Sequence, residues 1–245
     1  MEVGIVTVGD ELLSGDTVNA NATWLCKQLH ERGVGVRRVV VVPDEIEEIA
    51  AVIARERSQS GAIIVTGGVG PTHDDVTLDA IAQAVERPLV EHQEAKRWLT
   101  EEGGYSAASL VEGTVDLPAG ATAIHNEVGV APGAIVDGIY VFPGVPAEMQ
   151  AMFESVADDF AGTPRIRRTV TIDEPESHLI DRFATMQEAF NVAIGSYPGE
   201  QVSVRISGTE REEVDAAAQW LSDRAETVST EEGAKPHGRD EDTQN

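Results

Sequence analysis

Short apolar runs alternate with amphipathic helical patterns from the start of the chain, and this alternation limits the possible folds most strongly. The runs GIVTV (residues 4–8), VGVRRVVVV (residues 34–42) and GAIIVT (residues 61–66) are typical of strands. After the second and third runs, apolar residues recur at the helical spacing i, i+3, i+4 and i+7. These residues are Ile46, Ile49, Ala50 and Ile53, then Leu78, Ile81, Ala82 and Val85. The pattern predicts βαβ units and an α/β fold.

Residues 39–42 and 63–65 are almost continuously apolar, which is typical of parallel strands buried on both faces. A further strand, IYVF (residues 139–142), precedes a helix that Pro146 opens at a favoured first-turn position. Glycine and proline are frequent in residues 103–138, where we expect a β-rich excursion. The fold class is therefore an open, mostly parallel sheet flanked by helices, in a domain spanning residues 1–162.

The rhythm changes after residue 162. A strand (RRTVTI), a helix, strands near residues 192–197 and 201–207 and a last helix follow one another, which predicts a small α+β (βαββα) domain over residues 163–228. The apolar faces of the two helices carry Leu179, Phe183, Met186 and Phe190, then Val214, Ala217, Ala218 and Leu221. Large apolar residues are missing from about Ser229 onward, so residues 229–245 are expected to form a disordered acidic tail.

The charge balance is strongly acidic. The 245 residues include 43 Asp plus Glu and 18 Lys plus Arg, a formal net charge of -25. Salt at ~1 M shortens the screening length to about 3 Å, so we interpret this charge as an adaptation to a salty cytoplasm, with an acidic protein of an ordinary cell as the alternative. Neither nucleic acid nor an anionic membrane is an expected partner. Because no run of about 18 apolar residues occurs, we expect a cytoplasmic protein. We also expect a homo-oligomer.

Ligands of open α/β sheets bind where the βα loops gather, at the carboxyl ends of the strands. Four such loops carry glycines or carboxylates, and the third is the most informative. Its sequence, TGGVGPTHDD (residues 66–75), has three glycines within four residues before a helix. Bare, convergent amides and a helix N-terminus favour an anion, so we expect a phosphate-bearing ligand there, most simply a nucleotide.

Asp74 and Asp75 oppose an anion unless a hard divalent cation bridges them to the phosphate. We therefore expect Mg²⁺, with Mn²⁺ or Co²⁺ as substitutes, held by Asp74 and Asp75, and no redox cofactor. The alternative is structural, with Asp75 capping the following helix and the glycines forming a tight turn. Spacing alone does not choose between these two interpretations.

The segment TGGVGPTHDDVT (residues 66–77) resembles the signature of the molybdopterin-binding (MoaB/Mog) domain superfamily, in particular its competence/damage-inducible protein A (CinA) branch. Four more blocks resemble that family in the same order: VGDELLSGDTVNANATWLCKQLHERG (residues 8–33), VVPDEIEEI (41–49), NEVGVAPGA (126–134) and FPGVPAEM (142–149). The signature also resembles the N-terminal domain of eukaryotic FAD synthase. The resemblance spans residues 1–160 strongly and 165–225 weakly, the latter resembling the family's small accessory domain.

The resemblance implies roles for individual residues. Asp44 and Asp75 match the family's important acids and are the expected catalytic residues. The expected ligand-binding residues are Gly9, Asp10, Glu11, Ser14, Thr66, Gly67, Gly68, Gly70, Pro71, Thr72, His73, Pro143, Gly144 and Glu148. Longer CinA proteins continue into an amidase domain that deamidates nicotinamide mononucleotide. Because this chain ends before that domain, we expect the amidase activity to be absent.

Three functions remain open from the sequence. The first, which we favour, is a metal-dependent nucleotide pyrophosphatase that cleaves the diphosphate of an ADP-ribose-like or FAD-like substrate, as the CinA and FAD synthase resemblances imply. The second is a molybdopterin-binding protein of molybdenum cofactor biosynthesis, acting in adenylyl transfer or metal insertion. The third is a non-catalytic nucleotide or pterin binder.

Overall fold

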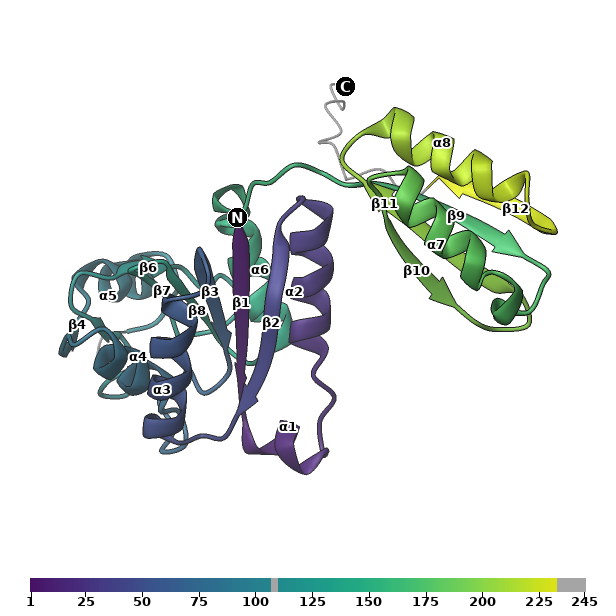
Figure 1. The fold of residues 1–245 in the computed structure, drawn as a ribbon. Coiled ribbons are helices and arrows are strands. Elements are labelled where there is room, and N and C mark those ends of the chain that lie inside the picture. Colours follow the sequence, from purple (N-terminus) through teal and green to yellow (C-terminus); the bar gives the residue numbers. More distant parts are fainter. Residues whose placement is uncertain (107–109, 233–245) are drawn as a thin grey trace, which may run out of the picture. The chain divides into compact units, whose positions relative to one another are not determined.

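A computed structural model describes residues 1–106 and 110–232. The chain divides into two compact units, one of residues 1–30 and 34–162, the other of residues 31–33 and the chain from residue 163. The larger unit contains a six-stranded sheet in the order β2-β1-β3-β8-β7-β6 (Figure 1). Its strands are β1 (Glu2–Val8), β2 (Gly35–Val42), β3 (Ala62–Thr66), β6 (Thr122–Ile124), β7 (Gly133–Val136) and β8 (Ile139–Phe142).

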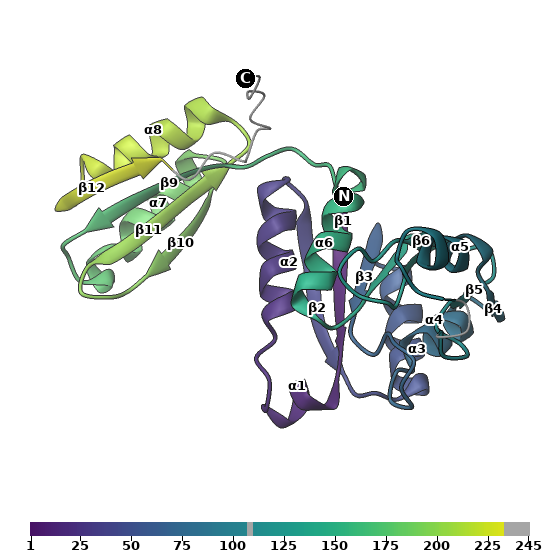
Figure 2. The ribbon, with the colours of Figure 1, turned by 180° about the vertical axis from the view of Figure 1, so that it is seen from behind.

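The first four strands in that order are parallel, and β7 and β6 are antiparallel additions. Helices pack on both faces of the sheet (Figures 1 and 2). One face is covered by α3 (Ile46–Arg57) and α4 (Thr77–Ala84), the other by α2 (Ala20–Glu31) and α6 (Pro146–Ser155). The predicted α/β class with a mostly parallel sheet is therefore confirmed.

Burial on both faces holds for β3 but not for β2. Every residue of β3 is buried, because strands flank it on both sides and helices cover both faces. In β2, only Val42 is buried, and Val39 is 41% exposed. The expectation of two buried faces is wrong for residues 39–41, since β2 is the edge strand and has a neighbour on one side only.

The excursion expected over residues 103–138 contains three of the short strands. Besides β6 and β7, it holds β5 (Asp116–Pro118), which pairs with β4 (Leu89–Glu91) in a separate two-stranded sheet. Helix α5 (Gln93–Glu101) packs its Leu99 against Val115 in a small satellite core. The unit closes with η1 (Ala157–Asp159), a single 3-10 turn.

The second unit is an antiparallel sheet in the order β10-β11-β9-β12 with helices packed against it. Its elements are β9 (Ile166–Ile172), η2 (Glu176–His178), α7 (Ile180–Ala189), β10 (Ala193–Tyr197), β11 (Val202–Gly208), α8 (Arg211–Ser222) and β12 (Thr227–Glu232). The predicted βαββα order is present, and β12 extends it by one strand.

Strand β12 corrects the expected start of the tail. It reaches Glu232, so residues 229–232 are not disordered as the sequence suggested. Composition missed this strand because its stability comes from pairing with β9 and from the Glu232 carboxylate, which lies 3.3 Å from Arg168 and 2.7 Å from Arg211. The remainder of the predicted tail, residues 233–245, lies outside the described residues.

In the described part of the chain, no helix combines the length and the apolar content needed to cross a bilayer.

Candidate functional site

The loops that follow β1, β2, β3 and β8 meet at one edge of the sheet, because these four strands are parallel and end on the same side. The first loop leads into the short helix α1 (Asp10–Ser14). The Gly-rich loop (residues 67–75) lies between β3 and α4, and the fourth loop opens α6. Each loop contributes residues that the sequence assigned to the site.

The Gly-rich loop has a backbone that requires glycine. Gly67 and Gly68 have φ values of 104° and 59°, and a Cβ on Gly67 would overlap the Val8 carbonyl. Thr77, the first residue of α4, fixes the loop from the other end. Its Oγ1 donates to the Gly67 carbonyl at 2.7 Å, and its N–H donates to the Gly68 carbonyl at 3.0 Å.

The amide groups of this loop differ in their partners, and the Gly67 N–H donates to the Phe142 carbonyl at 3.2 Å. The N–H groups of Thr72, Asp75 and Thr77 bond within the loop. Those of residues 68–70 have no partner among the described residues. Unpaired amides beside a helix N-terminus favour an anion, and the binding of a phosphate-bearing ligand stays a prediction.

Asp44 lies against the Gly-rich loop although it follows β2. Its Oδ2 accepts a hydrogen bond from the Asp10 N–H at 2.9 Å, and its Oδ1 would lie 3.2 Å from a Cβ on Gly68. Burial raises the pKa of Asp44, the Asp10 N–H lowers it, and the charges of Asp10, Glu11 and Asp74 raise it further. The Asp44 carboxylate therefore lies close to three other carboxylates.

Asp75 folds back over the loop. Its Oδ2 accepts from the Thr72 N–H at 2.9 Å and from Thr72 Oγ1 at 2.5 Å. The N-cap of α4 is Val76, without a side-chain cap bond, so the helix-capping interpretation of Asp75 is wrong. Thr72 Oγ1 also lies 2.6 Å from Asp74 Oδ1, and this bond is the main cause that lowers the pKa of Asp74. Thr72 thus contacts both carboxylates: its N–H donates to Asp75, and its one hydroxyl proton serves either Asp74 or Asp75.

Asn21 joins the third and fourth loops, a role that sequence reasoning missed. Its Nδ2 donates to the Gly144 carbonyl at 2.7 Å and to Thr66 Oγ1 at 3.2 Å. Thr66 Oγ1 donates its own proton to the Pro143 carbonyl at 2.8 Å, so it can only accept from Asn21. Because both partners of the Asn21 Nδ2 group are acceptors, they fix the orientation of the amide. Its Oδ1 is buried without a partner among the described residues.

Asn19 and Asn21 lie two positions apart at the start of α2, and their roles differ. Asn19 Oδ1 accepts from the Ala22 N–H at 3.1 Å and caps α2, and its Nδ2 donates to Thr7 Oγ1 at 2.9 Å. The sequence signal that could have indicated this role is the position of Asn21, two residues after the capping Asn19 and close to the first ligand loop.

A pocket of about 100 Å³ opens between the first, third and fourth loops. Gly144 approaches the Gly-rich loop closely at its edge, where a Cβ on Gly144 would lie 3.3 Å from the Cα of Gly67. The lining residues are Thr7, Val8, Glu11, Leu12, Thr17, Val18, Asn19, Ala20, Asn21, Thr66, Gly67, Gly144 and Pro146. Glu11, Thr66, Gly67 and Gly144 are the sequence-predicted residues among them.

The other predicted ligand-binding residues do not line this pocket. Ser14 Oγ bonds to the Glu11 carbonyl and to Asp16. Glu148 accepts from Asn126 Nδ2 at 2.7 Å. The remaining members lie in the expected loops: Gly9 is buried at the end of β1, Pro143 is buried after β8, Gly70 abuts Asp75, and Pro71 and the 98% exposed His73 lie at the outer end of the Gly-rich loop.

The acidic oxygen donors at this edge suit a hard divalent cation. Among the described residues, no group of three or more His, Cys, Asp or Glu side chains is arranged to hold a metal ion. Mg²⁺ binds through one or two carboxylates together with phosphate oxygens. The residues therefore fit a cation that arrives with a phosphate ligand.

The fold and its loops define an open α/β ligand-binding domain with a Gly-rich loop at the carboxyl edge of its sheet. Residues 4–168 match the family described as "Probable molybdopterin binding domain", and the chain belongs to that family. Residues 164–232 match the middle domain of FAD synthase. The expected resemblance to FAD synthase thus extends to the second unit.

Two relatives are similar to this chain over nearly their whole length. A protein of Archaeoglobus fulgidus is 36% identical over 225 residues, covering 91% of this chain and 97% of the relative. A protein of Thermococcus kodakarensis is 35% identical over 240 residues, covering 90% and 96%. A crystal structure of CinA from Thermoplasma acidophilum, described as having unknown function, is 30% identical, covers 65% of this chain and 97% of its own, and superimposes with a TM-score of 0.59. The predicted likeness to CinA is confirmed.

Proposed function

We propose that the chain hydrolyses the diphosphate bridge of an ADP-ribose-like or FAD-like dinucleotide with the help of a divalent cation. The observation that carries the proposal is that the Asp44 and Asp75 carboxylates lie against glycines of the Gly-rich loop. Asp44 abuts Gly68, Asp75 abuts Gly70, and the amides of residues 68–70 have no partner in the described part of the chain. An anion cradle beside carboxylates suits a ligand that brings phosphate and cation together.

In the proposed reaction, the amides of residues 68–70 hold one phosphate and the helix end of α4 adds its positive dipole. A water oxygen attacks one phosphorus. The bond from that phosphorus to the bridging oxygen breaks, and the bridging oxygen leaves on the second phosphate. The water proton passes to a carboxylate, and Asp44 is a better acceptor than Asp74, because burial raises the pKa of Asp44 whereas the hydrogen bond from Thr72 lowers the pKa of Asp74.

Asp74 and Asp75 would hold the cation together with oxygens of the substrate. Its chemistry would be to neutralise the charge that develops on the diphosphate. Thr72 would position Asp75 through its N–H and Asp74 through its hydroxyl. Asn21 would position the fourth loop through Gly144, next to the remaining half of a two-part ligand.

Molybdopterin binding is the second candidate, and the description of the matched family favours it. The same loop would then hold the phosphate of the pterin, and the reaction would be adenylyl transfer or metal insertion. Adenylyl transfer consumes ATP and releases pyrophosphate, whereas the proposed hydrolysis releases two monophosphates and requires only water.

The test is a hydrolysis screen of ADP-ribose, FAD and NAD at high KCl with Mg²⁺, Mn²⁺ or Co²⁺, in water enriched in oxygen-18. We expect AMP with ribose 5-phosphate from ADP-ribose, AMP with FMN from FAD, and one heavy oxygen in one of each product pair. Intact dinucleotides with all three metals, together with ATP-dependent adenylation of molybdopterin, would replace the hydrolase by the second candidate. Tight binding of a dinucleotide or pterin without turnover would identify a non-catalytic binder.

A further inference from the structure

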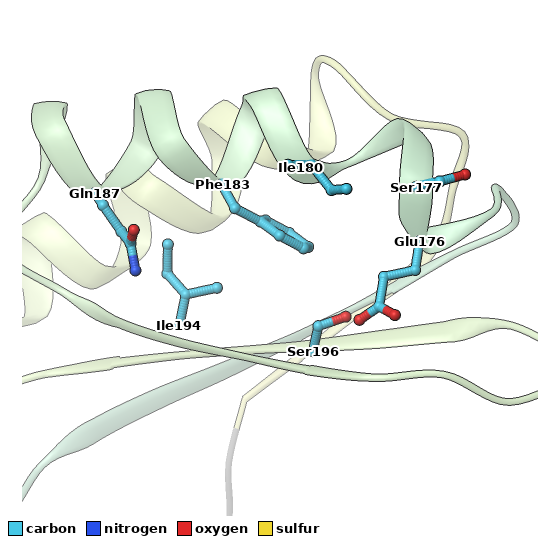
Figure 3. A pocket seen from close by; sticks show the side chains of 7 residues that line it. All are labelled: Glu176, Ser177, Ile180, Phe183, Gln187, Ile194 and Ser196. Carbon is cyan, nitrogen blue, oxygen red and sulfur yellow. The ribbon is translucent and has the colours of Figure 1, made fainter.

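A second pocket lies wholly within the second unit, between α7 with its preceding turn η2 and the edge strand β10 (Figure 3). Its volume is about 390 Å³, within the roughly 300–1,000 Å³ usual for small-molecule sites. The lining residues are Glu176, Ser177, Ile180, Phe183, Gln187, Ile194 and Ser196. The proposed hydrolysis uses none of them.

Ser196 interrupts an apolar row. Ile194 and Ser196 point to the same side of β10, since side chains alternate along a strand, and they pair with the buried Ile206 and Val204 of β11. An apolar residue would complete this core-facing row. Ser196 Oγ is instead buried without a hydrogen-bond partner among the described residues. A buried hydroxyl left unpaired at the wall of a pocket is an available contact for a ligand.

The walls of the pocket are apolar and partly open. The Phe183 side chain extends from α7 toward β10, with Ile180 beside it and Ile194 on the strand side (Figure 3). Ile180 is 61% exposed, and it is the one isoleucine among the large exposed apolar residues in the described part of the chain. An aromatic ring and two branched aliphatic side chains around one gap suit a flat, apolar ring.

The polar groups are arranged at the ends of this gap. Glu176 and Ser196 point into one end, and Gln187 lies at the other (Figure 3). Glu176 carries the one charge among the lining residues, and neither Lys nor Arg lines the pocket. An anion is therefore disfavoured, and the carboxylate favours a ligand that donates hydrogen bonds.

We propose that this pocket binds an uncharged, amino-substituted aromatic heterocycle of the aminopurine or aminopyrimidine class. The ring lies between Phe183 and Ile194, and its amino edge donates to the Glu176 carboxylate and to Ser196 Oγ. A ligand of this class satisfies the unpaired hydroxyl and the acidic end in one contact. The site is separate from the Gly-rich loop and its test does not depend on hydrolysis.

The experiment uses the full chain labelled with carbon-13 at the isoleucine methyl groups and titrated with adenine, at a salt concentration that keeps it folded. We expect the methyl signals of Ile180 and Ile194 to shift and saturate, while Ile63 in the main sheet stays unchanged. Purine lacks the amino group and should bind about tenfold more weakly, as the loss of a charge-assisted hydrogen bond implies. Equal binding of purine and adenine, or no shift with adenine, overturns the proposal.

Two variants locate the contacts. Glu176→Gln keeps the shape but removes the charge, and Ser196→Val completes the apolar row of β10; each should weaken adenine binding about tenfold. Ser196→Val should also raise Tm, which separates lost binding from misfolding. Glu188→Gln makes the same change at an exposed position of α7 and should bind adenine normally. Unaltered affinity in Glu176→Gln, or binding of butylamine as tight as that of adenine, contradicts the assigned class.

Discussion

The Asp44 carboxylate accepts a hydrogen bond from the backbone N–H of Asp10 at 2.9 Å, across 34 positions of sequence. This bond ties the loop after the edge strand β2 to the loop after β1. It holds Asp44 beside Gly68, within reach of the same ligand as the Gly-rich loop. An acidic residue in a loop without glycine thereby becomes part of a glycine-lined site.

Asp44→Asn should raise the free energy of unfolding at neutral pH. Burial raises the pKa of Asp44 in the folded chain, so its ionised form costs stability above the unfolded pKa. The cost disappears as the pH falls through the raised pKa, since the proton then binds the folded chain more tightly. Urea unfolding of both proteins between pH 8 and pH 4 should therefore show a gain for the variant at high pH that vanishes at low pH.

Glu45→Gln is the control for this experiment, because it removes the same charge from the neighbouring exposed position. It should bring no comparable gain in stability. A gain of equal size in Glu45→Gln would assign the effect to the net charge of the chain rather than to the site. Asp44→Asn should also lose hydrolysis, since its amide cannot accept a proton from water.

Asp75→Asn separates the charge of Asp75 from its role in shaping the loop. An amide oxygen can still accept the bonds from Thr72, so the free energy of unfolding should stay within about 0.5 kcal/mol of wild type. Dinucleotide hydrolysis should fall by about 100-fold or more, because the variant cannot hold a cation by charge. Asp79→Asn, at an exposed position in the first turn of α4, should keep normal turnover. Full turnover in Asp75→Asn would remove Asp75 from the site.

Asn21→Asp should destabilise the larger unit. The carboxylate has the same shape as the amide but cannot donate to the Gly144 carbonyl or to Thr66 Oγ1. Loss of these bonds, with acceptors left facing each other, should cost about 1–3 kcal/mol in urea unfolding. The measurement belongs in ~2 M KCl, where added negative charge is screened. A variant as stable as wild type there would show that the bridge between the two loops carries little energy.

Stability should rise steeply with salt. The formal net charge of -25 repels itself at low ionic strength, and at ~1 M salt the screening length falls to about 3 Å. Thermal unfolding followed by circular dichroism should give a substantially higher Tm in ~2 M KCl than in ~0.1 M KCl. The same Tm at both concentrations would contradict the interpretation of the acidic surface as an adaptation to salt and leave the site unaffected.

Much of the fold could be predicted because the patterns are local. Residues 62–65 are apolar throughout and lie in the central strand β3, and the i, i+3, i+4 spacing from Ile46 to Ile53 marks the buried face of α3. Strand β12 could not be predicted in this way. Its sequence, TVSTEE, has little apolar content, and its pairing with β9 joins segments far apart in the chain.

The sequence alone determined the fold class and the Gly-rich loop, because apolar periodicity and glycine spacing are properties of neighbouring residues. It determined the family through the resemblance of its ordered blocks to that family. Only the tertiary structure decided which side chains meet. In that structure Asp44 lies against Gly68, and Asp75 contacts Thr72 instead of capping the helix. Asn21 joins Thr66 to Gly144 by hydrogen bonds. These contacts depend on the order β2-β1-β3-β8, which brings the ends of separate strands to one edge. No local pattern encodes that order, since it arises from packing the whole sheet between its helices.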